Sequence, residues 1–356
     1  MQNLIPAIAE RGFLVDLLKV RNHGPHLRPM AGVRIVDLGS AHVYSSFCAV
    51  ARYLRQERPV AMLCDKDKVN RTAIFAKMIC RSGTSLVLRS GTTISVDLAH
   101  RSRFDRWSQW LSMRVLYRYA TAVVTPSEAA RTDLIRFAGL SPGLVKSLRS
   151  PLIPSSVFTS TPPAPDHPWF RPGEPPVILS VGELSSRKDF ATLVEAFALL
   201  RRRHACRLVI LGNGKQREAL LQLAAQRGVL DDFDLPGFKE NVFSFMAHSK
   251  VFAFTSRWEG FGNVLAEAMA CGIPVVATNC GAGPSELLHN YQHTNLVPIG
   301  DAAALASGIE HWLGQPIERE LWRDIVRGYE IESATTGYLT TLGLPAVPSS
   351  RGDIEI

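Results

Sequence analysis

Short apolar runs alternate with amphipathic segments along the second half of the chain. The runs "VILSVG" (177–182), "RLVILG" (207–212), "VFAFTS" (251–256) and "PVVAT" (274–278) are rich in β-branched and aromatic residues, which predicts buried strands. The segments between them, such as 189–203, place apolar residues at helical spacing. This alternation predicts βαβ units, and therefore an α/β fold with a parallel sheet that is covered by helices on both faces.

The first half of the chain shows the same alternation. Strands are expected at "FLVDLLKV", "VRIVDLG", "VAMLCD", "TSLVLR" and "TAVVTPS", with helical segments between or after them. The chain opens on a helix-like segment, "NLIPAIAERG", where a nucleotide-binding domain of this kind normally opens on a strand and a glycine-rich loop. We therefore expect two Rossmann-like domains, of which the N-terminal one lacks its first strand and glycine-rich loop.

One proline-rich stretch separates the two halves. Residues 151–176 contain nine prolines, which cannot continue helices or central strands. The expected organisation is an N-terminal Rossmann-like domain at 1–150, a linker at 151–176, a C-terminal Rossmann-like domain at 177–340 and a flexible tail at 341–356.

Composition restricts the setting in which the chain works. The six cysteines are scattered and show no metal-like spacing, which favours a reduced, cytoplasmic location and no metal site. No stretch approaches the ~20 apolar residues of a membrane span. Residues 1–150 hold 23 Lys and Arg against 10 Asp and Glu, whereas the whole chain has 40 against 32. The basic first half suggests an anionic partner, either a membrane surface or a phosphorylated acceptor, and nucleic acid is not expected.

Polar residues follow each C-terminal strand, where ligands bind in open α/β sheets. In "GELSSRKD", Arg187 and Lys188 precede a helix and could hold phosphate, or could be a solvated pair. Gly212 and Gly214 in "GNG" could let a ligand approach the backbone, or could form an ordinary turn.

The stretch "EGFGNVLAE" has the strongest pattern. Glu259 lies on a loop and Glu267 lies just over one turn inside a helix that begins near Asn263, so both carboxylates can face a ligand at the start of the helix. They could accept hydrogen bonds from sugar hydroxyls while the amides of Gly260 and Gly262 bind negative charge. Alternatively, Glu259 caps the helix and Glu267 is a surface residue.

From about Val177 to Leu288 the chain resembles the nucleotide-sugar domain of family 4 glycosyltransferases, which are retaining enzymes of the GT-B fold. The resemblance rests on "VGELSSRKDFATLVEAFALL", "RLVILGNG", "LPGF", "SRWEGFGNVLAEAMACGIPVVAT" and "GPSELL", in that order. It implies two Rossmann-like domains that face each other across a cleft.

The resemblance also implies roles for individual residues. Glu259 and Lys188 would be catalytic, the first near the donor sugar hydroxyls and the second on the diphosphate. Nucleotide-sugar-binding residues would be Arg187, Gly212, Gly214, Phe238, Gly260, Phe261, Gly262, Asn263 and Glu267.

The implied reaction moves a hexosyl or N-acetylhexosaminyl group from a UDP- or GDP-sugar to an acceptor hydroxyl, with retention and without a metal ion or other cofactor. The acceptor would be lipid-linked or a polysaccharide, and the enzyme would act in cell-surface polysaccharide, lipopolysaccharide or glycolipid synthesis at the cytoplasmic face of the inner membrane.

The chain departs from the family at three places. Glu183 stands where an arginine is common in the family, and the first strand with its glycine-rich loop is lacking. Many members have a catalytic histidine where the stretch 88–95 offers Arg89 and Thr92, and His100 is nearby but out of register. Two alternatives therefore stay open: a nucleotide-sugar-binding protein with impaired catalysis, and a GT-B nucleotide-sugar epimerase.

The segment 101–119, "RSRFDRWSQWLSMRVLYRY", is a basic helix candidate with interleaved aromatic residues. Such a helix could lie on an anionic membrane. It could equally bury its aromatic face on the N-terminal domain.

Overall fold

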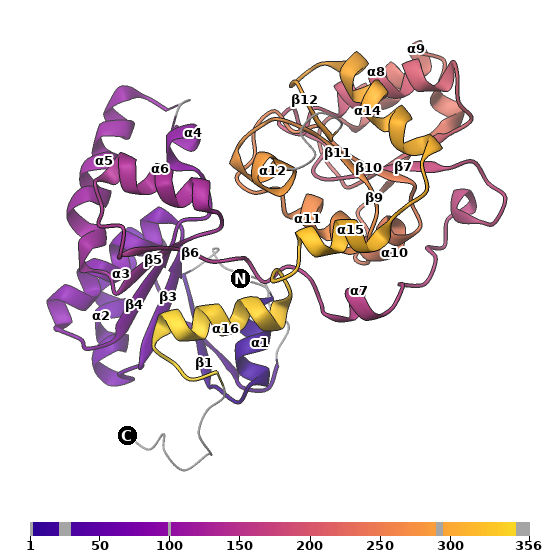
Figure 1. Ribbon diagram of the computed structural model, residues 1–356. Coiled ribbons are helices and arrows are strands. Elements are labelled where there is room, and N and C mark those ends of the chain that lie inside the picture. Colours follow the sequence, from indigo (N-terminus) through magenta and orange to yellow (C-terminus); the bar gives the residue numbers. More distant parts are fainter. Residues whose placement is uncertain (1–2, 21–29, 99–100, 290–294, 347–356) are drawn as a thin grey trace. The chain divides into compact units, whose positions relative to one another are not determined.

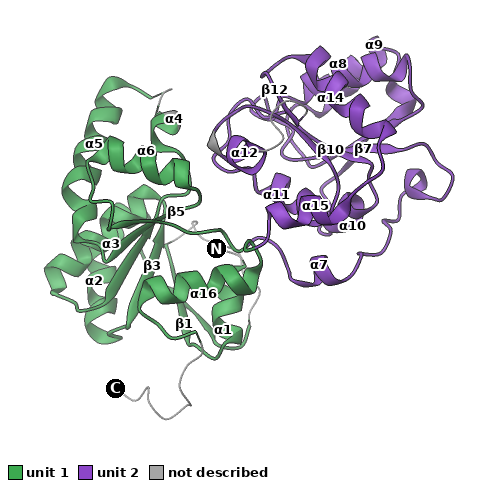
Figure 2. Ribbon diagram, viewed as in Figure 1, with its two compact units in different colours: residues 1–151, 328–356 green, residues 152–327 purple. Residues whose placement is uncertain are grey.

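The computed structural model describes residues 3–20, 30–98, 101–289 and 295–346 (Figure 1). The chain divides into two compact units, which are coloured separately in Figure 2: unit 1 contains residues 1–151 and 328–356, and unit 2 contains residues 152–327. Each unit is an α/β structure built on parallel strands, as the alternating sequence pattern predicts.

Unit 2 has one parallel sheet of six strands in the order β12-β11-β10-β7-β8-β9. The strands are β7 (Val177–Val181), β8 (Arg207–Leu211), β9 (Phe233–Gly237), β10 (Val251–Phe254), β11 (Val275–Thr278) and β12 (Leu296–Val297). Numbered from β7, this is the 3-2-1-4-5-6 order of dinucleotide-binding folds. The direction of winding therefore reverses between β7 and β10, which pair in register at Val251 and Ile178.

Helices cover both faces of this sheet because its central strands are apolar on both sides. In Figure 1, α8 (Phe190–Arg201) and α14 (Ala302–Gly314) lie on one face, and α10 (Val242–Ala247) and α11 (Asn263–Ala270) lie on the other. The remaining helices of unit 2 are α7 (Ser156–Thr159), α9 (Arg217–Gln226), α12 (Ala282–Leu287) and α15 (Arg319–Ile325), with 3₁₀ turns at Pro168–Phe170 and Leu230–Asp232.

Unit 1 has two separate parallel sheets. One pairs β1 (Val15–Lys19) with β2 (Val33–Asp37), and the other has the order β3-β4-β5-β6. The four strands are β3 (Ala61–Asp65), β4 (Ser85–Arg89), β5 (Ala122–Thr125) and β6 (Val145–Ser147). Among the described residues no strand pairs with both β1 and β3, so the first, central strand of a doubly wound sheet has no counterpart there.

The same helices nevertheless cover both sheets of unit 1. On one side, α2 (Phe47–Gln56) packs its buried residues against Leu18 and Val36 of the first sheet and Met62 of the second. On the other side, α1 (Leu4–Glu10) contacts β1 and β2, while its neighbour α16 (Ile331–Leu342) contacts β3 and β4. The other helices are α3 (Asp67–Cys80), α4 (Ile94–Leu98), α5 (Arg103–Leu116) and α6 (Glu128–Ala138), with 3₁₀ turns at Tyr44–Ser46 and Tyr117–Tyr119.

The unit boundaries differ from the predicted domains at both ends of unit 2. The proline-rich segment joins unit 2 rather than lying between the units: His167 pairs with Asp234 at 2.9 Å, and the ring centroid of Phe170 lies 5.3 Å from that of Phe245. The predicted domain 177–340 is too long, because α16 belongs to unit 1. There Tyr338 and Leu342 are buried against Val87 and Val124. The predicted tail therefore begins inside a packed helix, and its last part, 347–356, lies outside the described residues.

Candidate functional site

The loops after β7 and β10 meet where the winding of the sheet reverses. Ligands of open α/β sheets bind beyond the carboxyl ends of the strands at this point. The two loops are joined by backbone and side-chain bonds: the amide of Arg257 donates to the carbonyl of Arg187 at 2.8 Å, and the Thr255 hydroxyl donates to the carbonyl of Lys188 at 2.7 Å. The position of the Lys188 backbone is therefore determined by both loops.

An ion-pair cluster occupies this junction. Lys188 Nζ lies 2.6 Å and Arg187 Nη1 lies 2.5 Å from the same oxygen, Oε2 of Glu259. The Lys188 ammonium also lies 5.1 Å from the centroid of the Phe254 ring, and the residue is only 8% exposed. Two adjacent basic residues and a carboxylate that follows about seventy positions later thus form one charged group.

The two cations keep the Glu259 carboxyl ionised. Burial opposes ionisation, but the attraction of Lys188 and Arg187 and their hydrogen bonds outweigh it, so the pKa of Glu259 lies below its usual value. An ammonium has three N–H donors, of which Glu259 accepts one. The cluster carries two positive charges and one negative charge, so it has a net charge of +1 and can attract an anionic group.

Glycines let the surrounding loops approach each other closely. A Cβ on Gly212, whose φ is +138°, would lie 2.0 Å from the carbonyl oxygen of Gly182. A Cβ on Gly214 would lie 2.3 Å from the carbonyl oxygen of Leu184, and one on Gly283 would lie 2.0 Å from that of Phe261. The glycines after β8 and β11 therefore make backbone contacts with the loops after β7 and β10, and they bring all four loops to one end of the sheet.

The helix α11 begins as predicted, at Asn263. Gly262 precedes it with φ +82°, and no side chain caps the first turn there. Gly260 is half-buried, Phe261 is buried and Asn263 is exposed. Glu267 lies in the second turn, where burial raises the pKa of its carboxyl to about 7.

The raised pKa of Glu267 predicts a stability that depends on pH. The folded state holds the proton more tightly than the unfolded chain, so this stabilisation is fully present below pH ~4.5 and is lost as the pH rises to about 7. The loss is at most about 3 kcal/mol, at 1.4 kcal/mol per pH unit. The variant Glu267→Gln has no such loss, so its urea midpoint should exceed that of the wild type at pH 8 and approach it at pH 4.5. Exposed Glu218 on α9 provides the control variant Glu218→Gln, which should follow the wild type at both pH values. Parallel pH profiles for Glu267→Gln and the wild type would contradict the prediction.

The remaining residues that the sequence analysis singled out take no part in this ion-pair cluster. Phe238 follows β9 and is 69% exposed, and Glu183 is exposed. In unit 1, Thr92 is exposed, and Arg89 is held by Asp65 at 3.2 Å and by the Tyr338 hydroxyl at 3.3 Å, which ties β4 to α16. His100 lies outside the described residues.

Two charged residues beside the cluster were not predicted. Asp189 has φ +49° and accepts a hydrogen bond from Arg257 Nη1 at 3.3 Å, which adds a second ion pair between the loops after β7 and β10. The repeated basic–acidic order of "RKD" and "RWE" in the two loops is the signal that could have indicated paired loops.

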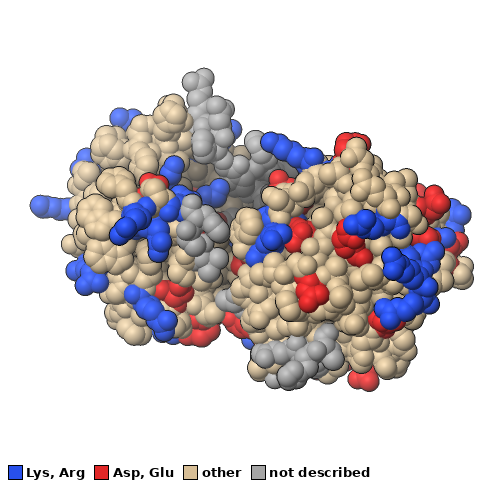
Figure 3. Space-filling model, turned by 90° about the horizontal axis from the view of Figure 1, so that it is seen from above, with Lys and Arg blue, Asp and Glu red and all other residues tan. Residues whose placement is uncertain are grey.

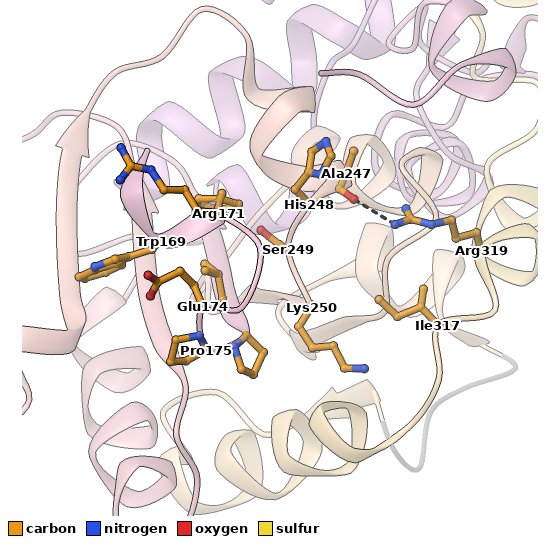
Figure 4. A pocket seen from close by; sticks show the side chains of 13 residues that line it. Trp169, Arg171, Glu174, Pro175, Ala247, His248, Ser249, Lys250, Ile317 and Arg319 are labelled. Atoms are coloured by element: carbon orange, nitrogen blue, oxygen red, sulfur yellow. Dashed lines mark hydrogen bonds between the residues drawn. The ribbon is translucent and has the colours of Figure 1, made fainter. Parts of the chain in front are cut away.

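A pocket of about 340 Å³ opens elsewhere in unit 2 (Figure 4). Its lining includes Val177 and Lys250, which stand at the amino ends of β7 and β10, opposite the ends where ligands are expected. Two of its basic side chains are already bonded within the protein, as Lys250 donates to the carbonyl of Gln315 at 2.7 Å and Arg319 to that of Cys271 at 2.8 Å. We therefore assign the site to the ion-pair cluster rather than to this pocket.

The described residues contain no group of three or more His, Cys, Asp or Glu side chains that could hold a metal ion. None of the helices over this part of the chain combines the length and the apolar character that crossing a membrane requires.

Residues 166–328 match the family model of the group 1 glycosyl transferases. The chain is 28% identical over 258 residues to the N-acetylgalactosamine-N,N'-diacetylbacillosaminyl-diphospho-undecaprenol 4-alpha-N-acetylgalactosaminyltransferase of Campylobacter jejuni, a match that covers 72% of this chain and 68% of that protein. It is 34% identical over 178 residues to the lipopolysaccharide core biosynthesis glycosyltransferase LpsE of Rhizobium meliloti, with 48% of this chain and 51% of the relative covered. The chain thus spans about two thirds of the first relative and about half of the second.

Solved structures of low sequence identity share the fold. HepE of Anabaena, in complex with UDP, superposes with a TM-score of 0.71 at 20% identity, over 87% of this chain and 86% of HepE. The sucrose-phosphate synthase of Thermosynechococcus elongatus gives a TM-score of 0.74 at 19% identity, over 95% of this chain and 90% of the synthase. Residues 166–328 are thus similar to the group 1 glycosyl transferases, and the chain shares the α/β fold of the GT-B type with these solved structures.

Proposed function

We propose that the protein transfers a hexosyl or N-acetylhexosaminyl group from a nucleotide diphosphate sugar to an acceptor hydroxyl, with retention at the anomeric carbon. The observation that carries this proposal is the cluster of Lys188, Arg187 and Glu259 at the point where the sheet of unit 2 reverses its winding. Departure of a nucleoside diphosphate builds up negative charge on phosphate, and preorganised cations stabilise that charge. In this proposal Lys188 and Arg187 bind the diphosphate. Glu259 orients both cations and accepts hydrogen bonds from hydroxyls of the donor sugar.

The relatives suggest the class of acceptor. The Campylobacter relative is named for a diphospho-undecaprenol substrate and LpsE for the lipopolysaccharide core. A mycobacterial relative, 37% identical over 141 residues, is named as a GDP-mannose-dependent phosphatidylinositol monomannoside mannosyltransferase. These names share glycolipid or lipid-linked acceptors, so we propose an acceptor of this kind, reached from the cytoplasmic side of the inner membrane, with a UDP- or GDP-sugar as donor.

Incubation with separate UDP- and GDP-sugars and an undecaprenyl-diphosphate-linked sugar tests the proposal. Release of the nucleoside diphosphate should depend on the acceptor, and NMR of the product should show the anomeric configuration of the donor. A product of inverted configuration would contradict retention. An isomerised nucleotide sugar that forms without acceptor would instead show an epimerase.

Metal dependence is a separate prediction. Because Lys188 and Arg187 can supply the positive charge that a divalent ion supplies in other phosphoryl sites, the transfer rate should be the same after treatment with EDTA. The control is a metal-dependent glycosyltransferase assayed in the same buffer. A loss of activity that Mg²⁺ or Mn²⁺ restores would contradict metal independence.

One observation favours a second candidate function. The sheets of unit 1 do not join between β1 and β3, and the loop that would follow a central strand there is absent from the described residues. A protein with an intact nucleotide site and an incomplete acceptor domain could bind a nucleotide sugar without transfer. A thermal-shift screen distinguishes the candidates: a nucleotide sugar that raises the melting temperature, but releases no nucleoside diphosphate with any acceptor, would support binding alone.

A further inference from the structure

One helix of unit 1 exposes a continuous apolar stripe. On α5, Phe104 is 72% exposed, Trp107 55%, Leu111 39% and Val115 45%. Steps of three and four residues place these side chains on one side of a helix. The rings of Phe104 and Trp107 also lie close together, with centroids 6.3 Å apart. The prediction that this helix buries its aromatic face is therefore wrong for Phe104 and Trp107.

The opposite side of α5 attaches the helix firmly to unit 1. Met113 is fully buried, and Leu116 and Tyr117 are 9% and 1% exposed. All three belong to the core that also contains Leu134 and Ala138 of α6. The exposed stripe is thus part of a packed helix rather than of a frayed segment, and its orientation on unit 1 is determined by this core.

Arginines accompany the stripe. Residues 101–119 contain five arginines and one acidic residue, Asp105, which gives a net charge of five minus one, or +4. On a helical wheel Arg103, Arg114 and Arg118 fall beside or within the stripe. Asp105 lies away from it and accepts a hydrogen bond from the Ser102 hydroxyl at 2.7 Å, as part of the N-terminal cap.

The apolar stripe and the arginines beside it identify a binding surface more specifically than the net charge of the chain does. The view in Figure 3 shows basic side chains scattered among uncharged and acidic ones, so net charge does not by itself mark one face there. Soluble monomers rarely expose a run of large apolar side chains on one helix. Aromatic rings prefer the boundary between the hydrocarbon and the headgroups of a bilayer, and arginines beside them can reach anionic headgroups.

We propose that the exposed side of α5, defined by Phe104, Trp107, Leu111 and Val115 with Arg103 and Arg114, docks the protein on an anionic lipid surface. Phe104 and Trp107 insert at the headgroup boundary. Arg103 and Arg114 pair with lipid phosphates. The inference does not depend on the proposed reaction, because it concerns a surface of unit 1 and requires no nucleotide sugar.

Flotation of the full chain with lipid vesicles tests the surface. The vesicles contain roughly one third phosphatidylglycerol in phosphatidylcholine, and pure phosphatidylcholine is the comparison. The wild type should float with the anionic vesicles, less so at high salt, and should stay in solution with the neutral ones. The variant Phe104→Ser/Trp107→Ser should lose about tenfold or more in affinity, and Arg103→Gln/Arg114→Gln about fivefold or more.

Matched variants separate docking from general stickiness. Leu230→Ser/Leu321→Ser removes two half-exposed apolar residues from unit 2, and Arg202→Gln/Arg203→Gln removes two basic ones, so both should bind vesicles like the wild type. Trp107→Phe keeps an aromatic ring and should also bind, but should lose the quenching of indole fluorescence by brominated lipid that the wild type shows. Circular dichroism and melting temperature should not differ among these variants, because the substituted side chains are exposed.

Three results would overturn the proposal. The first is failure of the wild type to float with anionic vesicles, and the second is equal binding by Phe104→Ser/Trp107→Ser. The third is a wild-type dimer in sedimentation that the same double variant abolishes, because the stripe would then be covered by a second copy of the chain. A transferase that is active on a water-soluble acceptor and fails to bind vesicles would overturn the docking surface and leave the proposed reaction intact.

Discussion

Replacing Lys188 with methionine is expected to lower kcat for sugar transfer by about a hundredfold or more, the usual cost of removing one preorganised donor from developing negative charge. Methionine keeps the apolar contacts that the lysine side chain makes beside Gly182 and removes the ammonium from Glu259 Oε2. Arg187 still pairs with that oxygen, so the carboxylate is not left without a partner. Steady-state kinetics with a saturating donor measure the effect.

Two further variants separate catalysis from stability in this test. The double variant Lys188→Met/Glu259→Gln removes the buried carboxylate charge as well, and it should be as inactive as the single variant while melting at a temperature closer to the wild type. Exposed Lys146 on β6 provides the control Lys146→Met, which should retain full activity. A Lys188→Met enzyme with more than a tenth of the wild-type kcat would exclude the lysine from the role that we propose.

Replacing Gly212 with alanine should strongly destabilise the protein. The new Cβ would stand 2.0 Å from the carbonyl oxygen of Gly182 and 2.9 Å from its carbon, and both are backbone atoms that a rotamer change cannot move. The φ of +138° adds strain for any residue with a side chain. The loops after β7 and β8 must then separate, at about 3 kcal/mol or more in the free energy of unfolding.

Gly173 provides a matched control, because its φ is +87° and nothing lies within 4 Å of a Cβ built there. Gly173→Ala should cost only about 1 kcal/mol, from the backbone conformation alone. Urea unfolding of both full-length variants compares the two. If both variants lost the same free energy of unfolding, the loops would be moving apart at Gly182 without an energetic cost, and the prediction would be wrong. A loss of nucleotide affinity without a loss of stability would show that Gly212 acts only at the ligand, as the family resemblance implies.

The architecture of unit 2 was predictable because its signals are local. Strands β7, β8, β10 and β11 are short runs that are mostly buried on both faces, and helices separate them along the chain, so these strands follow directly from the sequence. A parallel sheet with right-handed crossovers admits few strand orders. The resemblance to family 4 glycosyltransferases pointed to the loops that carry the predicted site, and residues 166–328 match the model of the group 1 glycosyl transferases.

The end of unit 2 was predicted wrongly because helices look alike in sequence wherever they pack. The apolar spacing of 331–342 predicts a helix, but not which core receives it. Tyr338 and Leu342 are buried with Val87 and Val124, which stand more than two hundred residues earlier. Such a contact has no local signature.

The candidate site was also predicted only in part from the sequence. The sequence identified Lys188, Arg187 and Glu259 as polar residues that follow strands, and the resemblance gave them a donor-binding role. It did not show that both cations share one carboxylate oxygen, or that Asp189 and Arg257 form a second pair beside them. These pairs depend on the adjacency of β7 and β10, which are not consecutive in the chain.

By itself the sequence determined the class of the fold, the order of its elements and the loops that carry the polar residues, because periodicity and glycine placement act over a few neighbouring positions. Tertiary structure alone decided three matters: that α16 returns to unit 1, that Gly212 lets two backbones lie close together, and that α5 turns Phe104 and Trp107 outward. Each of these depends on contacts between distant segments, and burial against a distant partner leaves no periodic signal in the chain.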